Sequence, residues 1–468
     1  MSSRTEKDFL GSKEIPIDAY YGVHTARALD NFNVTGVQIN HFPRFIIAMA
    51  MVKKASVAAN LEFKLLPEHI AAAIIEACDE IIDGKLHEHF VVDLIQGGAG
   101  TSTNMNANEV IANRALEILG HAKGSYKHLH PNDHVNLSQS TNDVYPTAFR
   151  VGLLLSHAGV LEALEHLIGR LRERAELFRA IYKIGRTQLQ DAVPMTLGQE
   201  FQAFADTLSE ETQRFRDLEG LLCEVGLGGT AIGTGINAPK GYSRVVCRHL
   251  AEISGFPVTT ASNPIEATSD TGMYLTWSGV LRRTATKLSK ICNDLRLLAS
   301  GPRAGLGEIR LPPVQAGSSI MPGKVNPVIP EMVNQVAYQV MGNDLSVMLA
   351  CEGGQLQLNA FEPVMVANLF QSIDIMKRAM LILADRCVAG IQPNIEHCQQ
   401  NLDASITLIT LLNPQLGYEL SSELAVEALA TNRTIRELVL ERNLMTSEAY
   451  DVLVKESAAL DQCVQITL

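Results

Sequence analysis

The sequence predicts an all-α protein built around a bundle of long helices, and two observations lead to this prediction. Hydrophobic residues make up 46% of the 468 residues, whereas aromatic residues make up only 5%. A core of Ala, Leu, Ile, Val and Met favours packed helices over aromatic-rich strands. In the middle of the chain, apolar residues also recur at steps of three and four, which is the period of an amphipathic helix.

Residues 1–140 are predicted to form shorter helices joined by glycine-rich loops. The chain starts with MSSRTEKDFLGSKEIP, which is charged and lacks the apolar segment of a signal peptide. The longest apolar run, FIIAMAMV (45–52), is too short to span a bilayer, so no membrane partner is expected. Eight scattered cysteines, none in a C-x-x-C pair, indicate buried free thiols and a cytoplasmic protein.

Five long helices are predicted in the middle of the chain. The first runs from about Pro146 to Tyr182, with Leu164, Leu171 and Phe178 on one apolar stripe. At 1.5 Å per residue it would be about 55 Å long, which exceeds the diameter of a compact globule and predicts an elongated bundle. Ala, Gly and Ser on the polar faces suggest contacts between bundles of different subunits. The other four helices are predicted at 197–222, 279–300, 326–350 and 362–387.

A third, smaller region of short helices follows the sequence GIQPN (390–394). We therefore expect three domains, which span residues 1–140, 141–394 and 395–468. The formal net charge of −12 argues against a nucleic-acid partner, because binding to a phosphate backbone needs clustered Lys and Arg.

Four polar loops between the helices are candidates for a functional site. Hydroxyl groups, amides and free backbone N–H groups near helix N-termini form anion-binding sites. Any one of these loops could be only a helix cap, but four in one chain, one of them with Lys324, indicate a small dianionic ligand. The loops are QGGAGTSTNMNANEV (96–110), HPNDHVNLSQSTNDVYP (130–146), GRTQLQDAVPMTLGQE (185–200) and GSSIMPGKVNP (317–327).

Other motifs in the sequence do not predict a cofactor or a metal site. GLGGTA (226–231) fits the dinucleotide-binding pattern G-x-G-x-x-A, but helical sequence precedes it where a strand is required. PGKVN lacks the Ser or Thr that follows the lysine of a P-loop. The two close histidine pairs lack the companion ligands of a zinc site. The single Trp277 lies in a predicted helix and is expected in the core.

The loop GSSIMPGKVNP has no acidic residue, and its serines suggest a basic hydroxyl group. A serine in a tight, glycine-flanked loop can act as a base if backbone N–H groups and a lysine stabilise its oxyanion. A carboxylate in the same loop would repel both the alkoxide and an anionic substrate. Ser319 could then donate to the substrate, and Lys324 could pair with a substrate carboxylate beside Asn326.

The same loop resembles the signature loop of the fumarase/aspartase superfamily, and the resemblance extends over nearly the whole chain. Four further stretches resemble the aspartate ammonia-lyase branch more than class II fumarases. The resemblance implies an all-α fold of three domains, a homotetramer that pools its long helices, and active sites that each draw on three subunits. The four stretches are AYYGVHT (19–25), QGGAGTS (96–102), QSTND (139–143) and GQLQLNAFEP (354–363).

The resemblance also implies reversible anti elimination of ammonia from L-aspartate to fumarate, with Ser318 as the base and an enediolate carbanion as intermediate. Gln188 is a further expected substrate-binding residue. It stands where fumarases and some members of the aspartase branch carry His and others carry Gln, so no titrating general acid is expected there. The implied contacts are Thr101, Ser140, Thr141 and Ser319 to the β-carboxylate, Thr187, Lys324 and Asn326 to the α-carboxylate, and Asn142 to the amino group. Two alternatives stay open, namely a class II fumarase and a non-catalytic structural protein like those of the eye lens.

Overall fold

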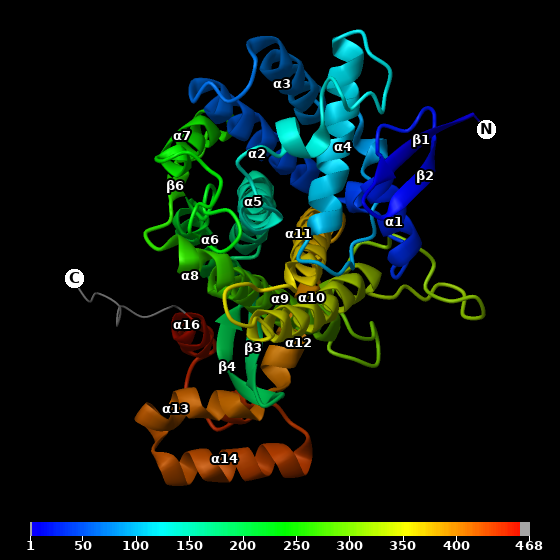
Figure 1. The fold of residues 1–468 in the computed structure, drawn as a ribbon. Coiled ribbons are helices and arrows are strands. Elements are labelled where there is room, and N and C mark those ends of the chain that lie inside the picture. The colour runs from blue at the N-terminus through cyan, green and yellow to red at the C-terminus, as the bar shows by residue number, and fades with distance from the viewer. Residues whose placement is uncertain (1, 459–468) are drawn as a thin grey trace. The chain divides into compact units, whose positions relative to one another are not determined.

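The computed structural model describes residues 2–458 and confirms the all-α class for this part of the chain. Helices dominate this part of the chain (Figure 1), and its strands form four separate two-stranded sheets. The chain folds into two compact units. The first contains the chain up to residue 162 together with 213–285 and 338–377, and the second contains 163–212, 286–337 and the chain from 378 onward. The division into three domains stays a prediction.

All five long helices form, with boundaries that differ from the predicted ones by up to seven residues. The first begins at Thr141, before the expected start at Pro146, because Ser140 caps it and the ring of Pro146 is accommodated in an early turn. It ends at Leu177, because the chain then enters a β-hairpin that was not predicted. The five are α5 (Thr141–Leu177), α6 (Leu197–Leu222), α9 (Gly272–Leu298), α10 (Val328–Glu352) and α11 (Glu362–Arg386).

The first unit consists mainly of the N-terminal helices, and α2 packs against both α3 and α7. Its N-terminal hairpin, β1–β2, was not predicted from the sequence. The unit's own elements are β1 (Ser3–Asp8), β2 (Gly11–Pro16), α1 (Val23–Asn31), η1 (Ile39–His41), α2 (Pro43–Glu62), α3 (Glu68–Ile82), η2 (His87–His89), α4 (Thr101–Ile118), the π-helix η3 (Pro131–Val135), β5 (Glu224–Val225), α7 (Tyr242–Ser254), β6 (Thr259–Thr260) and α8 (Pro264–Ser269).

Aromatic side chains from distant segments meet in the core of the first unit. The rings of Phe149 and Tyr274 stack at 4.1 Å between centroids, and Phe45 packs edge-on against Tyr145 at 5.3 Å. Trp277 is fully buried, which confirms its predicted place in the core. These contacts hold the start of α5 against α2 and α9, and the start of α5 carries three candidate site residues.

The second unit combines the hairpin β3–β4 with the C-terminal helices. The helices α13 and α14 lie side by side in it (Figure 1) and enclose a small core with Leu412, Leu424 and Tyr450. The unit's own elements are β3 (Tyr182–Thr187), β4 (Gln190–Thr196), β7 (Ile309–Arg310), η4 (Val388–Gly390), β8 (Gln392–Pro393), α12 (Ile395–Ala404), η5 (Ile406–Leu408), α13 (Ile409–Leu416), α14 (Tyr418–Thr431), α15 (Ile435–Glu441) and α16 (Ser447–Ser457).

The cysteines in the described residues are all free thiols, as predicted. Six of these seven are buried, and Cys351 is partly exposed. Burial raises the pKa of the Cys78 thiol to about 12, so this side chain behaves as a small apolar group. Cys463 lies outside the described residues.

One helix of the described chain, α5, is long and apolar enough by composition to cross a membrane. However, 61% of its most apolar stretch is buried inside the protein, as expected of a core helix.

Candidate active site

Thr101 is the first residue of α4, and a close glycine contact fixes the start of this helix. Gly100 has a φ of +87°, and a Cβ atom at this position would lie 2.3 Å from the Tyr145 ring. Only glycine fits both constraints, so the N-terminus of α4 rests directly on the first turns of α5. The exposed Thr101 therefore lies at a helix N-terminus, where backbone N–H groups favour an anion.

The predicted residues Ser140, Thr141 and Asn142 lie together at the start of α5. Ser140 Oγ accepts a hydrogen bond from the Asn142 backbone N–H at 3.2 Å. The Asn142 side chain donates through Nδ2 to the Ala231 carbonyl at 2.8 Å, which leaves its Oδ1 as the atom that can accept from a ligand. Thr141 Oγ1 accepts from Asn104 Nδ2 at 3.0 Å. The first unit thus brings four predicted residues together at the adjoining starts of α4 and α5.

The GLGGTA stretch has a structural role at the same place. The buried Asp143 carboxylate accepts hydrogen bonds from the backbone N–H groups of Gly228 and Thr230, both at 3.0 Å. It also accepts from the Ser140 N–H at 2.9 Å. Burial raises the pKa of Asp143 to about 6, although these three donors oppose the shift. The loop 226–231 is therefore attached to the first turn of α5.

Thr187 and Gln188 lie in the second unit, at the tip of the hairpin β3–β4. Gln188 and Leu189 have φ values of +54° and +63°, a left-handed pair that closes a two-residue turn. The expected loop over residues 185–200 is therefore a hairpin followed by the first residues of α6. Such strain in residues other than glycine is typical of functional positions. Both Thr187 and Gln188 are exposed.

The loop 317–327, here called the serine loop, is closed by hydrogen bonds between its two ends. Gly317 N–H donates to the Lys324 carbonyl at 2.8 Å, and Asn326 Nδ2 donates to the Gly317 carbonyl at 2.6 Å. A Cβ atom on Gly317 would lie 2.6 Å from that Lys324 carbonyl oxygen, so a larger residue would open the loop. The loop thus holds the exposed Ser319 and Lys324 next to Ser318.

Two backbone N–H groups point at the hydroxyl of Ser318. Its Oγ accepts from Met321 N at 3.0 Å and from Ile320 N at 3.2 Å. Donors to an oxygen stabilise its deprotonated form, so this arrangement lowers the cost of forming the alkoxide. The serine loop also contains no acidic side chain that would oppose it. The role of Ser318 as a base stays a prediction.

The sequence reasoning missed a group of buried polar residues behind Thr141. Lys53, Asn104 and Asn108 are each at most 1% exposed, and all three donate to the side-chain oxygen of Asn136. The signal for Lys53 was its place directly after the apolar run 45–52, in a helix most of whose residues are buried.

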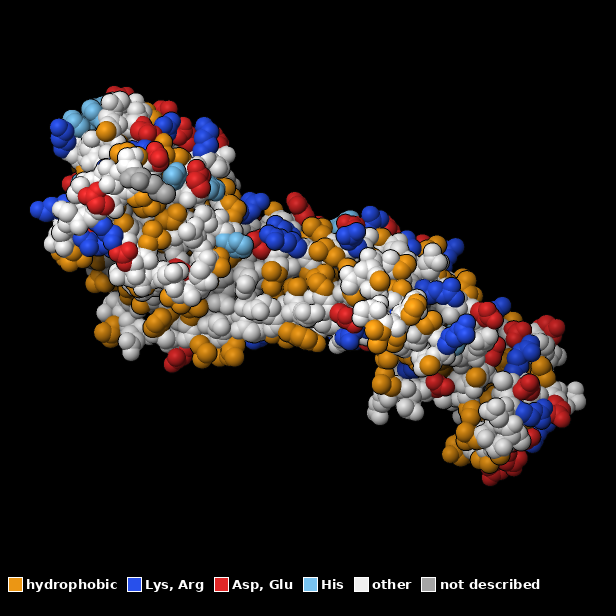
Figure 2. All heavy atoms as spheres, turned by 90° about the vertical axis from the view of Figure 1, so that its right-hand side faces the viewer, with side chains coloured by type: hydrophobic (Ala, Val, Ile, Leu, Met, Phe, Trp, Pro, Cys, Tyr) orange, Lys and Arg blue, Asp and Glu red, His pale blue; other side chains and the backbone are white. Residues whose placement is uncertain are grey.

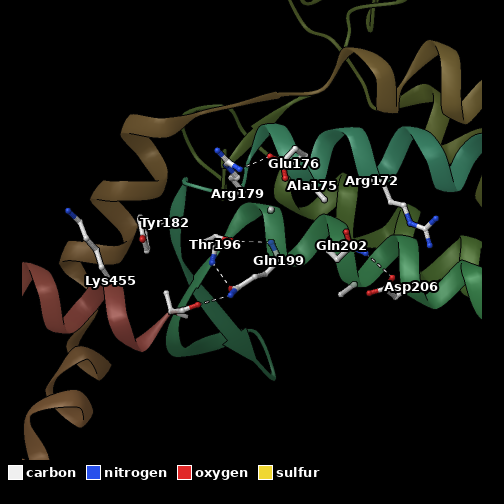
Figure 3. A pocket seen from close by; sticks show the side chains of 13 residues that line it. Arg172, Ala175, Glu176, Arg179, Tyr182, Thr196, Gln199, Gln202, Asp206 and Lys455 are labelled. Atoms are coloured by element: carbon white, nitrogen blue, oxygen red, sulfur yellow. Dashed lines mark hydrogen bonds and ion pairs between the residues drawn. The ribbon is translucent and has the colours of Figure 1, made fainter. Parts of the chain in front are cut away.

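One large pocket of the described chain contains no predicted site residue. It is a cavity of about 670 Å³ in the second unit, between the end of α5, the start of α6 and α16 (Figure 3). Its charged rim is largely paired internally, as in the Arg179–Glu176 bond of 2.7 Å. Gln199 and Gln202 are likewise bonded to the Ala458 carbonyl and to Asp206. This pocket therefore gives no support to the predicted site.

Within residues 2–458, no group of three or more His, Cys, Asp or Glu side chains is arranged to hold a metal ion. The predicted site residues carry hydroxyls, amides and one ammonium group, which is that of Lys324. Such a set suits carboxylates, which accept hydrogen bonds from all three kinds of donor.

Comparisons with known proteins agree with this chemistry. The profile of the family described as Lyase matches residues 11–342, and that of the Fumarase C C-terminus matches residues 408–457. Aspartate ammonia-lyase from Pseudomonas aeruginosa is 58% identical over 97% of both chains. A solved Brucella melitensis structure, a fumarate lyase:delta crystallin bound to cobalt, has a TM-score of 0.96 and 56% identity, and covers 98% of this chain and all of its own. Class II fumarase from Schistosoma mansoni has a TM-score of 0.92 but only 36% identity, with 98% and 99% coverage.

Proposed function

This chain belongs to the lyase family that includes fumarases and aspartate ammonia-lyases, and from this premise we propose that Ser318 is the base of an aspartate ammonia-lyase. The protein is a carbon–nitrogen lyase that converts L-aspartate to fumarate and ammonia. The observation that carries the role of Ser318 is the pair of backbone N–H groups that donate to its Oγ.

In the proposed mechanism the Ser318 alkoxide removes the proton from C3 of L-aspartate. The electron pair of that C–H bond delocalises into the β-carboxylate and gives an enediolate. It then forms the C2–C3 double bond while the C–N bond breaks, so that fumarate and ammonia leave. Ammonia needs no proton from the enzyme to depart, which suits the non-titrating amide of Gln188.

The two substrate carboxylates are assigned to different residues. Thr101, Ser140, Thr141 and Ser319 bind the β-carboxylate, where their donors also stabilise the enediolate as negative charge develops. Thr187, Lys324 and Asn326 bind the α-carboxylate, and Gln188 lies beside them. Asn142 faces the amino group, and its orientation supports this role because its Oδ1 is left to accept from an ammonium donor.

We also propose that the protein is a homotetramer in which each site draws on several chains. Thr101, Thr187, Gln188, Ser319 and Lys324 are all exposed in the single chain, so further surface is needed to exclude water from the reaction. An exposed apolar stripe on α10 supports self-association, because Tyr338, Leu345 and Leu349 follow a helical period. Figure 2 shows hydrophobic side chains gathering in several places on the face it presents.

The proposed location is the cytoplasm, where free thiols persist, and the proposed domains are residues 1–140, 141–394 and 395–468. The alternative of a class II fumarase is not favoured, because the identity to the compared fumarase is 36% and to the compared aspartate ammonia-lyase 58%.

The test is to incubate the purified protein separately with L-aspartate and with L-malate and to follow the absorbance of fumarate. We expect fumarate from L-aspartate and little or none from L-malate. Faster conversion of L-malate would make the protein a hydratase and overturn the proposal. Ser318→Ala protein prepared in the same way is the control for contaminating enzymes.

A further inference from the structure

The hydroxyl of Thr141 is held in one hydrogen-bonding direction by a buried side chain. Thr141 Oγ1 accepts from Asn104 Nδ2 at 3.0 Å. Among the described residues, no acceptor receives a hydrogen bond from the Thr141 hydroxyl. A hydroxyl has one proton and two lone pairs. Because Thr141 accepts a hydrogen bond from the buried Asn104, its own proton is left to donate to a ligand.

The direction of the Asn104 amide is fixed by the acceptor on its other side. Asn104 Nδ2 also donates to Asn136 Oδ1 at 3.2 Å, and the same oxygen accepts from Lys53 Nζ at 2.9 Å. If the Asn104 amide were reversed, its oxygen would face the oxygens of both Asn136 and Thr141. Asn104 Oδ1 is buried without a partner among the described residues. The orientation of the Asn104 amide is therefore determined by the two hydrogen bonds that its Nδ2 donates.

Lys53 sets the direction for the whole chain of bonds. It is fully buried and donates to Asn136 Oδ1 and Gln139 Oε1, both at 2.9 Å. Gln139 cannot turn to offer a donor instead, because its Nε2 donates to the Val135 and Leu137 carbonyls. Burial lowers the pKa of Lys53 to about 7, yet an amine with two protons still satisfies both acceptors. The direction therefore holds in either protonation state.

We propose that Asn104 is a positioning residue for the elimination. Lys53 fixes the orientation of Asn104 through Asn136, and Asn104 in turn holds the Thr141 hydroxyl as a donor to the substrate carboxylate. This chain of four residues is here called the amide relay. The proposal rests on the proposed function, because Thr141 must contact the substrate for the relay to matter. A donor fixed before the ligand binds loses no rotational freedom when charge develops on the carboxylate.

Asn104→Asp tests the relay, because the aspartate has the same shape but offers only acceptors. Its carboxylate would accept a hydrogen bond from the Thr141 hydroxyl, so that the hydroxyl would donate to this carboxylate and not to the substrate. A hydrogen bond to a charged group changes affinity about ten- to hundredfold. We therefore expect kcat/KM for L-aspartate to fall, and the inhibition constant of fumarate to rise, by that factor.

Asn108→Asp is the matched control. Asn108 lies one turn further along α4, is also buried, donates to the same Asn136 Oδ1 at 3.1 Å and also has an unpartnered Oδ1. It makes no bond to Thr141. The two variants should lose similar thermal stability, whereas Asn108→Asp should keep kcat/KM within about threefold of wild type. Equal kinetic losses in the two variants would show that the role of Asn104 is only structural.

A double-mutant cycle with Thr141→Val shows whether Asn104 acts through the hydroxyl. Thr141→Val alone should lower kcat/KM, and adding Asn104→Asp should then change it by less than about threefold, because coupled residues are not additive. A full additional loss, or no effect of Thr141→Val, would overturn the relay. If Asn104→Asp does not fold, the uncharged pair Asn104→Ala and Asn108→Ala serves instead. If the wild-type protein forms no fumarate from L-aspartate, the proposed function is refuted. If the wild type is active but the Asn104 and Asn108 variants lose kcat/KM equally, only the relay is refuted.

Discussion

The proposed role of Ser318 as the base leads to a prediction about turnover. Ser318 Oγ accepts hydrogen bonds from two backbone N–H groups, while the proposed contacts to the substrate carboxylates come from other side chains. Changing Ser318→Ala should therefore lower kcat on the order of a thousandfold while the affinity for fumarate stays near that of wild type. Steady-state kinetics with L-aspartate and inhibition by fumarate measure the two effects separately. Near-normal turnover in this variant would assign the base to another group.

Lys53 gives a prediction about stability and pH, because its pKa differs between the folded and unfolded chain. Burial lowers the pKa in the folded protein from 10.5 to about 7, and the titratable groups that face it are the Asp143 carboxyl and the Cys78 thiol. Between these two values the unfolded chain binds more protons, so the free energy of unfolding contributed by Lys53 rises with pH. Relative to Lys53→Met, wild type should gain up to about 1.4 kcal/mol per pH unit above pH 7.

Urea unfolding of both proteins at pH 7.5 and pH 9 measures this difference. The Cys78 thiol does not interfere, because its pKa is raised to about 12. Lys54→Met is the control, since Lys54 is adjacent in sequence but partly exposed and paired with Asp79. Parallel stability curves for wild type and Lys53→Met would mean that Lys53 titrates alike in the folded and unfolded chain.

At the scale of secondary-structure elements, the contact between α4 and α5 brings together the starts of the two helices, which carry Thr101 and Thr141. Gly100→Ala would place a Cβ atom 2.3 Å from the Tyr145 ring at a φ of +87°. Strain and overpacking should lower the free energy of unfolding by roughly 2–4 kcal/mol, and fumarate should bind more weakly. Gly120→Ala, at the other end of α4, is the control, because its φ is +78° with open space around it. Equal losses of thermal stability in the two variants would exclude the ring contact as the cause.

The long helices were predictable from sequence, but the hairpin β3–β4 was not. Apolar periodicity reports which face of a helix is buried, and it located α6 to the residue. The hairpin turn uses Gln188 and Leu189 where Asn or Gly would normally mark a two-residue turn, so no turn signal stood in the sequence.

The candidate residues at the starts of α4 and α5 and in the serine loop were found from their loops, whereas the amide relay was not. Periodicity cannot tell which polar side chains point inward, and Asn104 and Asn136 are far from Lys53 in sequence. Only the fold shows that the three meet behind Thr141. The roles that the resemblance gives to the site residues stay predictions.

At the scale of the whole molecule, the candidate residues are divided between the two units. Thr101, Ser140, Thr141 and Asn142 belong to the first, while Thr187, Gln188 and the serine loop belong to the second. In the proposed mechanism, a small dicarboxylate contacts both sets at once. The proposed oligomer would allow this by combining one set from one chain with the other set from a neighbour.

Mixing two inactive variants tests directly whether these residues act as one shared site. Thr141→Ala and Ser318→Ala subunits, unfolded and refolded together at equal ratio, should recover activity. If each site takes Thr141 from one chain and Ser318 from another, roughly a quarter of the sites are wild type by random assembly. Each variant refolded alone, and wild type refolded alone, are the controls for background and yield. Efficient refolding of the mixture with no recovered conversion of L-aspartate would contradict a shared site.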